Sequence, residues 1–291
     1  MAEFLTTSEV AAYLRIKERT VYELVRNRRI PCSRATGRLL FPKSMVDAWV
    51  RAQVDYSGPA VEAAPPVIAG SHDPLLDWAV RESGCELALM SAGSSDGLRR
   101  LELGQAVAAG LHLIDPATGD YNGPALAASA KFAELVLIHW AWRDQGLVVA
   151  RENRRAISSI ADLVKPGVTV ARRQDGSGSQ LLLLHLLNRA GLDRERVAWL
   201  DVPMRTESDV AAAVLEGKAD CGLAVASVAL GHGLRFIPVH RERFDIAMRR
   251  RDYFEAPLQR LMSFTRTAAF AERARALGGY DIAATGQAMP V

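Results

Sequence analysis

The sequence changes its pattern once, between residues 52 and 66, and this change constrains the fold more than any other feature. From Val67 onward, short apolar runs alternate with amphipathic helical segments. Such alternation is typical of an α/β domain with mostly parallel strands. Before this point the chain shows short helical segments, and the stretch between contains Gly-Pro and Pro-Pro pairs without periodicity. The sequence therefore predicts a small head at 1–51, a linker at 52–66 and a larger α/β domain at 67–291.

Hydropathy and cysteine use exclude two classes of protein. The longest apolar run, 135–142, contains His139 and is far shorter than the roughly 20 residues that a membrane-spanning helix needs. The N-terminus carries no secretory pattern of basic residues followed by an apolar stretch. The three cysteines, Cys32, Cys85 and Cys221, are isolated and lack metal-ligand spacing. These features predict a cytoplasmic protein with no membrane partner, no metal site and no bound cofactor.

The net charge of +3 is distributed unevenly along the chain. Residues 1–51 carry ten Lys and Arg side chains against five Asp and Glu, whereas residues 52–291 carry 26 against 28. A basic head on a near-neutral body is typical of a phosphate-binding module attached to a sensor. Charge alone does not separate this interpretation from an ordinary solvated basic surface.

Two short amphipathic helices are expected within the first 27 residues. Thr6 and Glu9 have the spacing of a capping box, in which each side chain bonds to the backbone amide of the other residue. A second helix is expected over 20–27, and about four residues join the two, as in a helix-turn-helix. Residues 30–41 predict a hairpin with its turn near Gly37, and Pro42 suits the first turn of a third helix.

The order of these motifs resembles the excisionase-type heads of the MerR-like winged-helix proteins. The similar segments are 5–14, 19–26, Ile30-Pro31, Gly37-Arg38, Phe41 and 47–49. The resemblance implies that the second helix enters the major groove of double-stranded DNA and that the hairpin lies as a wing on the backbone. The residues that it places against DNA are Arg19, Thr20, Tyr22, Arg26 and Arg38. The chain departs from the family pattern at Lys17, where a capping Ser or Thr is common, and at Arg28-Arg29, where a glycine is usual.

Three turns of small residues in the larger domain follow expected strands and open expected helices. These turns are 69–73, 92–97 and 172–179. Backbone amides at a helix start lack partners inside the helix, and the helix dipole favours negative charge there. Several such turns around one cleft would cradle an anion, although N-capping by Ser and Asp is the ordinary alternative. The third turn lacks the Gly-Lys-Ser/Thr signature of a phosphate loop, which argues against a nucleotide ligand.

A weak internal repeat favours two similar lobes with a cleft between them. A strand runs into a Gly/Ser turn and a helix at 92–103 and again at 171–187, and each unit is followed by a glycine and a small-residue strand. Chance similarity in an alanine-rich chain is the alternative. Two separate strands are expected at 135–142 and 146–150, and the final residues 285–291 are expected to be frayed.

The larger domain resembles the periplasmic-binding-protein-like domain that is found fused to such heads and to molybdopterin-synthesis proteins. It is similar to periplasmic molybdate- and tungstate-binding proteins. The similarity rests on short motifs in a fixed order: 70–73, 110–115, 118–122, 143–147, 166–168, 173–179 and 217–223. The resemblance implies an α/β protein in which a winged helix-turn-helix precedes a two-lobed type 2 periplasmic-binding fold, kept inside the cell as a sensor.

The resemblance also implies a ligand site shared by the two lobes. It places Ser94 and Ser95 in one lobe and Arg173, Ser177 and Ser179 in the other. Weaker candidates are His72, His112 and Thr206. Hydroxyl and amide donors suit a tetrahedral oxyanion, and an arginine can offset one of its charges. Molybdate or tungstate is therefore the expected effector, although Arg172 and the missing histidine after Thr206 depart from the family pattern.

Other functions explain the sequence less well. The runner-up is a regulator that senses a small organic acid, in the manner of LysR-type effector domains, with Trp140, Trp142 and Tyr121 as a wall for the organic part. An enzyme would need a nucleophile and a base, but the chain has no Gly-x-Ser-x-Gly elbow and no clustered metal ligands. We therefore expect a ligand-responsive transcription regulator and not an enzyme. A homodimer is expected because one short recognition helix reads few base pairs, with 135–142 and the C-terminal helices as candidate dimer surfaces.

Overall fold

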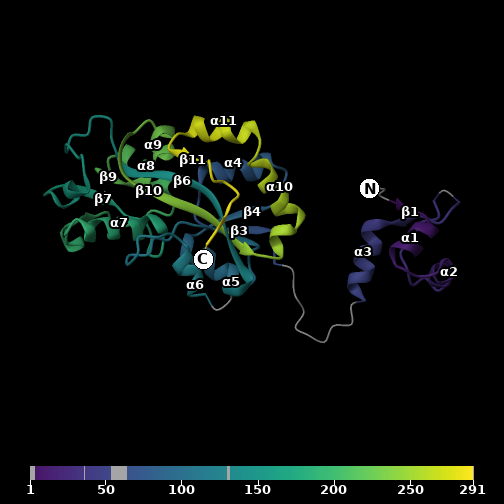
Figure 1. Ribbon diagram of the computed structural model, residues 1–291. Helices are drawn as coiled ribbons and strands as arrows, with labels where there is room; N and C mark the ends of the chain where they lie inside the picture. The colour runs from purple at the N-terminus through teal and green to yellow at the C-terminus, as the bar shows by residue number, and fades with distance from the viewer. Residues whose placement is uncertain (1–3, 36, 54–63, 130–131, 291) are drawn as a thin grey trace. The chain divides into compact units, whose positions relative to one another are not determined.

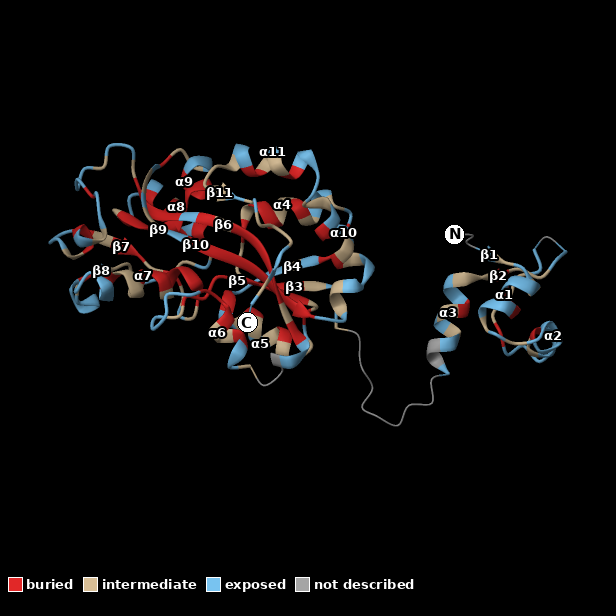
Figure 2. Ribbon diagram, in the orientation of Figure 1, coloured by how far each residue is buried: buried red, intermediate tan, exposed pale blue. Residues whose placement is uncertain are grey.

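The chain contains two compact units, Met1–Val61 and Glu62–Val291. The structure is a computed structural model, and it describes residues 4–35, 37–53, 64–129 and 132–290. Each unit has its own buried core, which Figure 2 shows in red. The expected linker at 52–66 falls largely outside the described residues.

The first unit is a helical head. Its helices are α1 (Thr7–Tyr13), α2 (Glu18–Arg26) and α3 (Lys43–Ala52), and strand β1 (Phe4–Leu5) pairs antiparallel with β2 (Phe41–Pro42). The predicted capping box is confirmed, since the Glu9 amide donates to the Thr6 hydroxyl and the Thr6 amide donates to the Glu9 carboxylate. An antiparallel bridge between Ser33 and Leu40 confirms the hairpin.

Apolar side chains from all three helices and the hairpin form the core of the head. The fully buried members are Val10, Val21, Phe41 and Val46. The expected helix start at Pro42 was wrong by one residue, because Pro42 ends strand β2 before α3 begins. The second helix begins two residues earlier than expected, at Glu18, and its N-cap Lys17 makes no side-chain capping bond.

The second unit is built on one mixed sheet, with two lobes. The order along its main path is β4-β3-β5-β10-β6-β9-β7-β8. The outer pairs β3–β4, β3–β5, β7–β8 and β7–β9 are parallel, as the alternating pattern predicts. The strands are β3 (Val67–Gly70), β4 (Ala88–Ser91), β5 (Ala108–Leu111), β6 (Leu135–Val149), β7 (Thr169–Ala171), β8 (Ala198–Trp199), β9 (Cys221–Val225) and β10 (Arg235–Arg249).

Two long antiparallel strands, β6 and β10, join the lobes. They lie side by side through the whole second unit (Figure 1), with register shifts between Pro238 and His240 and between Phe244 and Asp245. The expectation of separate strands at 135–142 and 146–150 was wrong, because β6 runs continuously through the polar residues between them. One lobe therefore contains β3, β4 and β5, and the other contains β7, β8 and β9.

Helices cover the sheet in both lobes. The first lobe contributes α4 (Pro74–Glu82), α5 (Ser94–Glu102), α6 (Gly123–Ala127), α10 (Ala256–Phe264) and α11 (Ala268–Leu277). The second contributes α7 (Gly178–Arg189), α8 (Glu207–Leu215) and α9 (Ala226–Gly231). Short 3-10 turns lie at Phe132–Glu134, Ile160–Val164, Arg194–Arg196 and Asp252–Phe254. Among the described helices, none combines the length and the apolar character needed to span a bilayer.

The C-terminal segment closes over β6. Strands β11 (Tyr280–Asp281) and β12 (Ala288–Met289) both pair antiparallel with it, and the Thr285 hydroxyl donates to the Trp140 carbonyl oxygen at 2.6 Å. The expectation that the last residues are frayed was wrong for this reason. Strand β6 is also mostly buried, so residues 135–142, one of the candidate dimer surfaces, form part of the sheet core.

Candidate functional site

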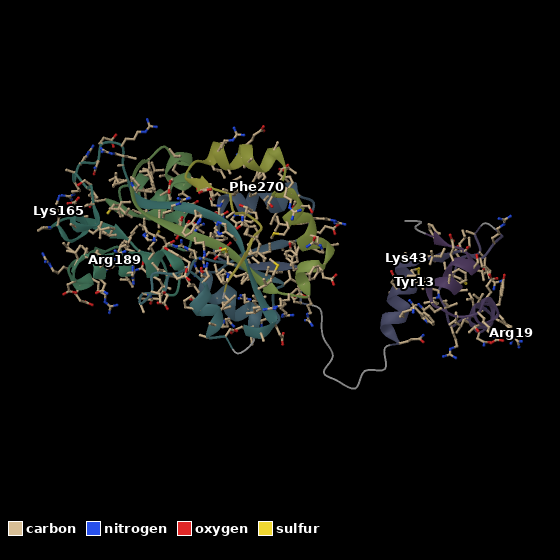
Figure 3. The ribbon with its side chains drawn as sticks, in the orientation of Figure 1. Tyr13, Arg19, Lys43, Lys165, Arg189 and Phe270 are labelled. Atoms are coloured by element: carbon tan, nitrogen blue, oxygen red, sulfur yellow. The ribbon has the colours of Figure 1, made fainter. Side chains whose placement is uncertain are left out.

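The predicted DNA-binding side chains are all exposed on the head. Arg19, Tyr22 and Arg26 line one surface hollow on α2, together with Glu23. The Arg19 side chain is 89% exposed and makes one ion pair with Glu23 at 3.2 Å, and Figure 3 shows it at the edge of the head. Thr20 and Arg38, the latter after the hairpin turn, are exposed as well. The structure therefore leaves all five predicted residues accessible to a partner.

The backbone at the C-terminus of α2 shows why a glycine is usual at residue 28, where this chain has an arginine. Arg28 adopts a φ of 54°, in the left-handed region that favours glycine. Its amide donates to the Val25 carbonyl at 3.1 Å, and the Arg29 amide donates to the Leu24 carbonyl at 2.8 Å. These two bonds form a Schellman motif with an arginine at the position that glycine usually takes. The head thus keeps an extra cation at a backbone position that disfavours it.

The two lobes meet at a seam between the start of α5 and the start of α7. We define this interlobe seam by Gly93, Ser95 and His112 on one side and by 176–178 on the other. The Ser95 hydroxyl donates to the Gly176 carbonyl oxygen at 3.0 Å. A Cβ added to Gly93 would lie 3.5 Å from the Ser177 Cα, and one added to Gly178 would lie 2.6 Å from the His112 ring. The described structure is therefore a closed form with the lobes in contact.

The helix starts at the seam differ in how their amides are satisfied. Ser177 caps α7, and its hydroxyl accepts from the Gln180 amide at 3.3 Å. The N-cap of α5 is Gly93, which has a φ of 98° and no side chain to offer a capping bond. The positive ends of two helix dipoles therefore face each other, and the first turn of α5 lacks a side-chain acceptor. This arrangement favours a negative charge at the seam.

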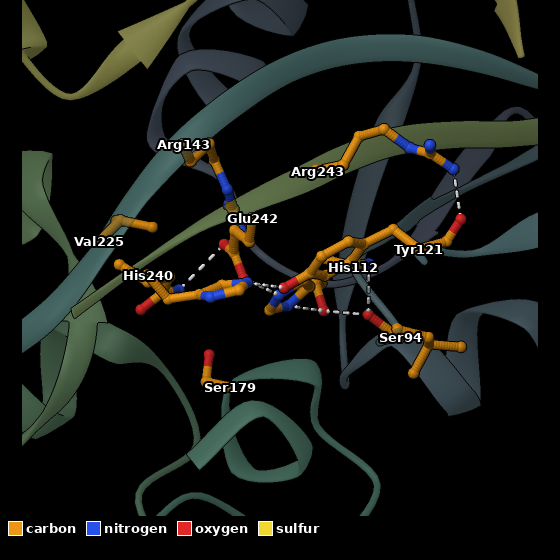
Figure 4. Close-up of polar contacts among 12 residues, drawn as sticks. Ser94, His112, Tyr121, Arg143, Ser179, Val225, His240, Glu242 and Arg243 are labelled. Carbon is orange, nitrogen blue, oxygen red and sulfur yellow. Dashed lines mark hydrogen bonds and ion pairs between the residues drawn. The ribbon is translucent and has the colours of Figure 1, made fainter. Parts of the chain in front are cut away.

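A chain of hydrogen bonds runs behind the start of α5 (Figure 4). The fully buried Ser94 hydroxyl accepts from the His112 backbone amide at 3.1 Å and lies 2.8 Å from the Ser71 hydroxyl. The Ser71 hydroxyl lies 3.0 Å from His112 Nε2, and His112 Nδ1 lies 2.8 Å from a carboxylate oxygen of Glu242. The loop after β3, the start of α5 and the strands β5 and β10 thus meet at one histidine.

Glu242 belongs to a buried ionic cluster on the long strands. The Arg143 guanidinium donates to Glu242 and, at 3.0 Å, to the Asp73 carboxylate. The Trp140 indole and the Tyr280 hydroxyl also donate to Asp73, at 3.1 and 2.7 Å. Burial alone would raise the pKa of Glu242, but Arg143 and His112 lower it to about 2. Glu242 is therefore ionised at neutral pH, and it fixes a proton on His112 Nδ1.

The second lobe carries a matching carboxylate, Glu207, at the start of α8. The buried Ser179 hydroxyl donates to one Glu207 oxygen at 2.5 Å, and the Val225 amide donates to the other at 2.9 Å. The Gln145 side-chain amide donates to both Glu207 and Glu242, at 3.0 and 2.9 Å. Gln145 therefore links the polar groups of the two lobes across strand β6.

The remaining predicted ligand residues lie at or near the seam in different roles. Arg173 is largely buried, and its guanidinium donates to the carbonyl oxygens of Met204 and Arg205 at 3.0 and 2.7 Å. Burial lowers the pKa of Arg173, although Glu207 and Asp209 oppose this shift. Thr206 caps α8 in a capping box with Asp209. His72 is half-buried beside Ser71, and it is Ser71 that bonds to His112.

Sequence reasoning missed the residues that hold the seam from behind. Ser71 lay in a turn that had been singled out, but no pattern distinguished it from its neighbours. Arg143, Gln145 and Glu242 occupy polar stretches that resemble exposed loops, and only the pairing of β6 with β10 shows that they are buried. Glu207 carried one usable signal, because an acidic residue at the first position of a helix complements its dipole.

The aromatic wall expected for an organic ligand is not formed. Trp140 is fully buried in the core of the first lobe, where its ring packs edge-on against Phe270 at a centroid distance of 5.3 Å. Tyr121 is buried, and its hydroxyl lies 2.9 Å from His240 Nε2. Trp142 is half-buried and stacks near Arg241. Within the part of the chain that the structure describes, no group of three His, Cys, Asp or Glu side chains is arranged to hold a metal ion.

Comparison with known proteins identifies both units. Residues 4–54 match the helix-turn-helix domain model, and residues 77–266 match the model of the PBP superfamily domain. An uncharacterized protein of Bacillus subtilis, YvgK, is 24% identical over 97% of this chain and 96% of its own length.

Solved structures share the fold at low sequence identity. A phosphate-bound putative phosphate transporter substrate-binding protein from Clostridium perfringens matches with a TM-score of 0.52, 12% identity, and coverage of 72% of this chain and 96% of its own. A tungstate ABC transporter protein from Geobacter sulfurreducens matches with a TM-score of 0.51 and 13% identity, and the match covers 71% of this chain and 95% of its own. OxyR of Corynebacterium glutamicum matches with a TM-score of 0.52 and 14% identity, and the match covers 92% of this chain and 90% of its own.

These matches confirm the predicted fold, a helix-turn-helix head followed by a two-lobed α/β domain of the periplasmic-binding type. A head of this kind indicates DNA binding, and the larger domain indicates a small-ligand partner. The combination indicates a binding and regulatory role rather than catalysis. The chain belongs to the PBP superfamily domain family, with a helix-turn-helix domain at its N-terminus.

Proposed function

We propose that this chain is a cytoplasmic transcription regulator that binds a small tetrahedral oxyanion, molybdate or tungstate, at the interlobe seam. The observation that carries the proposal is the opposition of two helix starts, α5 and α7, in direct contact across the seam. Like ends of helix dipoles repel, and an anion between them converts the repulsion into attraction from both sides. The first turn of α5, which has no side-chain cap, supplies amide donors.

The chemistry of the neighbouring side chains favours an anion with several acceptor oxygens. Ser95 and Ser177 lie at the seam, one from each lobe, and a serine hydroxyl can turn its proton toward an acceptor. Arg143 lies behind them and is already paired with Asp73 and Glu242. The ligand is therefore held by neutral donors, in keeping with the shared fold of a tungstate transporter protein and of a phosphate-bound protein.

Ligand binding at the seam would regulate DNA binding through lobe closure. An anion that bonds to both α5 and α7 stabilises the closed arrangement over an open one by its differential affinity. Closure changes DNA affinity only if it alters the relation between paired heads, so the active species is a homodimer. Each head then presents Arg19, Tyr22 and Arg26 to one half-site of double-stranded DNA.

Titration calorimetry of the full chain tests the ligand. The panel contains tungstate, molybdate, sulfate, phosphate and small carboxylates. We expect tight binding of tungstate or molybdate and a loss of about tenfold or more for Ser94→Ala, since a hydrogen bond to a charged partner contributes about 1.5–3 kcal/mol. Ser83→Ala, on the far end of α4, is the matched control and should bind as the unaltered chain does. If only a carboxylate produced binding heat, the ligand would be a small organic acid and not an oxyanion.

Deletion of residues 1–51 tests the division of labour between the units. The shortened chain should lose DNA binding and keep its affinity for the anion, because the second unit contains both sides of the seam. Gel-shift and calorimetric measurements on the same preparation check the two properties. A shortened chain that still bound operator DNA would contradict the assignment of the head.

A further inference from the structure

The polar chain at His112 has a direction that depends on one proton. Three hydrogen-bonding groups lie in series, from His112 Nε2 to the Ser71 hydroxyl at 3.0 Å and on to the Ser94 hydroxyl at 2.8 Å. A serine hydroxyl has one proton to donate and two lone pairs that accept. Since Glu242 is ionised, His112 Nδ1 carries a proton in every state of the ring. Nε2 is then the atom that gains or loses a proton.

When the imidazole is neutral, the series points inward. Nε2 is an acceptor, so the Ser71 hydroxyl donates its proton to the ring. The contact between the two hydroxyls then requires Ser94 to donate to Ser71. Ser94 also accepts from the His112 backbone amide, so only a lone pair of its oxygen remains for an external partner. In this state the Ser94 oxygen repels an anion.

When the imidazole is protonated, Nε2 becomes a donor, and the series can then run in the opposite direction. Nε2 donates to the Ser71 oxygen, and Ser71 donates to the Ser94 oxygen. Ser94 still accepts from the His112 amide, and its own proton is now free for an external acceptor. A proton taken up at the His112 ring therefore appears as a hydrogen-bond donor at the start of α5. Without an acceptor, this buried hydroxyl donor would be left unsatisfied at a cost of about 1–3 kcal/mol.

We propose that His112 is a specificity-determining residue that takes up one proton when a fully deprotonated tetrahedral oxyanion binds, and that Ser71 relays this change to Ser94. This proposal rests on the proposed function, and it specifies the protonation form of the anion that the seam selects. Tungstate, molybdate and sulfate carry only acceptor oxygens, and they need the donor state. Hydrogen phosphate can donate its own proton to the lone pair that the neutral state presents.

The groups around the ring act on its two states in opposite directions. Glu242, on β10, faces Nδ1 and favours the imidazolium, while Phe244 stacks on the ring at a centroid distance of 5.8 Å. Gly178 at the start of α7 covers the ring from the other lobe, and its helix dipole disfavours a second positive charge. The charged groups beyond Glu242 are Arg143, which bonds to it directly, Asp73 behind Arg143, and Glu207, joined through Gln145. An anion at the seam tips this balance toward the imidazolium.

Calorimetry in paired buffers tests the relay. Titrations with tungstate at about pH 8, in two buffers that differ in ionisation enthalpy, give the number of protons taken up per anion bound. We expect about one proton for the full chain, and an affinity that falls about tenfold per pH unit in the alkaline range. Hydrogen phosphate, where it binds, should show about zero proton uptake.

Two variants identify the group that takes up the proton. Ser71→Ala cuts the relay but keeps the His112–Glu242 bond, so proton uptake with tungstate should fall to about zero and the pH dependence should flatten. His240→Gln is the matched control, because His240 is half-buried near Glu242 and bonds to Tyr121 outside the series. It should keep an uptake of about one proton.

The outcomes separate the relay from the proposed function. Tungstate binding by the full chain without proton uptake would overturn the relay and leave the oxyanion function intact. Uptake that survives Ser71→Ala, or that disappears in His240→Gln, would also overturn it. Failure of every oxyanion to bind would overturn the proposed function, and the relay with it.

Discussion

Helix α2 of the head and the interior of the body use arginine in opposite ways. In the head, the Arg19 side chain is 89% exposed, and Arg26 lies beside it on the same open face. In the body, the Arg143 side chain is fully buried and is paired with two carboxylates, while Arg173 is bonded to backbone carbonyl oxygens. An exposed cation can pair with a phosphate from outside, whereas a buried and paired one cannot be released without a large cost.

This difference agrees with the proposal that one chain binds two anions of different kinds. DNA is a polyanion whose phosphates are met by several solvated arginines, and the resulting affinity depends strongly on salt. A small oxyanion at the seam would meet hydroxyl and amide donors in a site shielded from solvent, where salt screens little. In the proposed site, the buried charges of the body would position those donors without contacting the ligand themselves.

The largest effect is expected from removing the central cation of the body. Arg143→Met leaves Asp73 and Glu242 buried without their partner, so the free energy of unfolding should fall by about 3–5 kcal/mol. Urea unfolding followed by tryptophan fluorescence measures this, since Trp140 lies in the same core. Arg26→Met in the head is the control and should change stability by less than about 0.5 kcal/mol. Equal effects at both positions would break the comparison between head and body.

A smaller effect concerns the stability of the body in acid. The pKa of Glu242 is about 2 in the folded protein and 4.5 in its ordinary state. A lowered pKa contributes stability that is present above about pH 4.5 and is lost as the pH falls toward about 2. Glu242→Gln should therefore lower the melting temperature at neutral pH and flatten its decline in this window.

An exposed carboxylate of the head provides the control for the acid experiment. The backbone amide of Thr6 and its side chain lower the pKa of Glu9, which is fully exposed to solvent. Glu9→Gln should leave the pH profile of the body unchanged. A body profile that shifted equally in both variants would show that Glu242 is not the group responsible.

The sequence predicted the elements with regular patterns and missed the polar interior. The capping box at Thr6 and the small-residue starts of α5 and α7 carry local signals, because caps and helix starts depend on a few adjacent residues. The middle of β6 carries Arg143 and Gln145, and the middle of β10 carries Glu242 and Arg243. Charged residues in a strand are expected at a surface, so both segments resembled loops or exposed edges.

These strands are polar for a reason that only the tertiary structure reveals. Each strand passes through both lobes, so its middle lies behind the seam, where polar side chains pair across β6 and β10. Such pairing depends on residues about 100 positions apart in sequence, as Arg143 and Glu242 are. The candidate site was therefore predictable at its helix starts and not in the layer that supports them.

The DNA-binding face of the head should respond to salt in a way that the seam does not. Arg26→Gln removes one exposed cation from the face of α2, so the slope of log affinity against log salt concentration should decrease by about one. Binding to an operator fragment at several salt concentrations measures this slope. The same variant should bind tungstate with unchanged affinity. An unchanged slope would show that Arg26 does not contact phosphate.

The smallest effect sharpens the comparison at Arg28, where a charged residue occupies a strained backbone position. A non-glycine residue in the left-handed region is strained by roughly 1 kcal/mol or more, and the Schellman bonds of Arg28 use only backbone atoms. Arg28→Gly relieves this strain, and the greater conformational entropy of glycine in the unfolded chain offsets part of the gain. The net stabilisation of α2 should be roughly 0.5–1 kcal/mol. Hydrogen exchange of the α2 amides in the full chain measures this gain.

The same substitution should weaken DNA binding, because it removes one cation from the end of α2. Arg28→Asn separates the two contributions, since asparagine tolerates the left-handed region but carries no charge. It should match the glycine variant in DNA affinity and fall between glycine and arginine in stability. If both variants gained stability and kept full DNA affinity, Arg28 would be a solvated charge without a partner. The exposed arginines of the head would then have to be divided into those that bind DNA and those that do not.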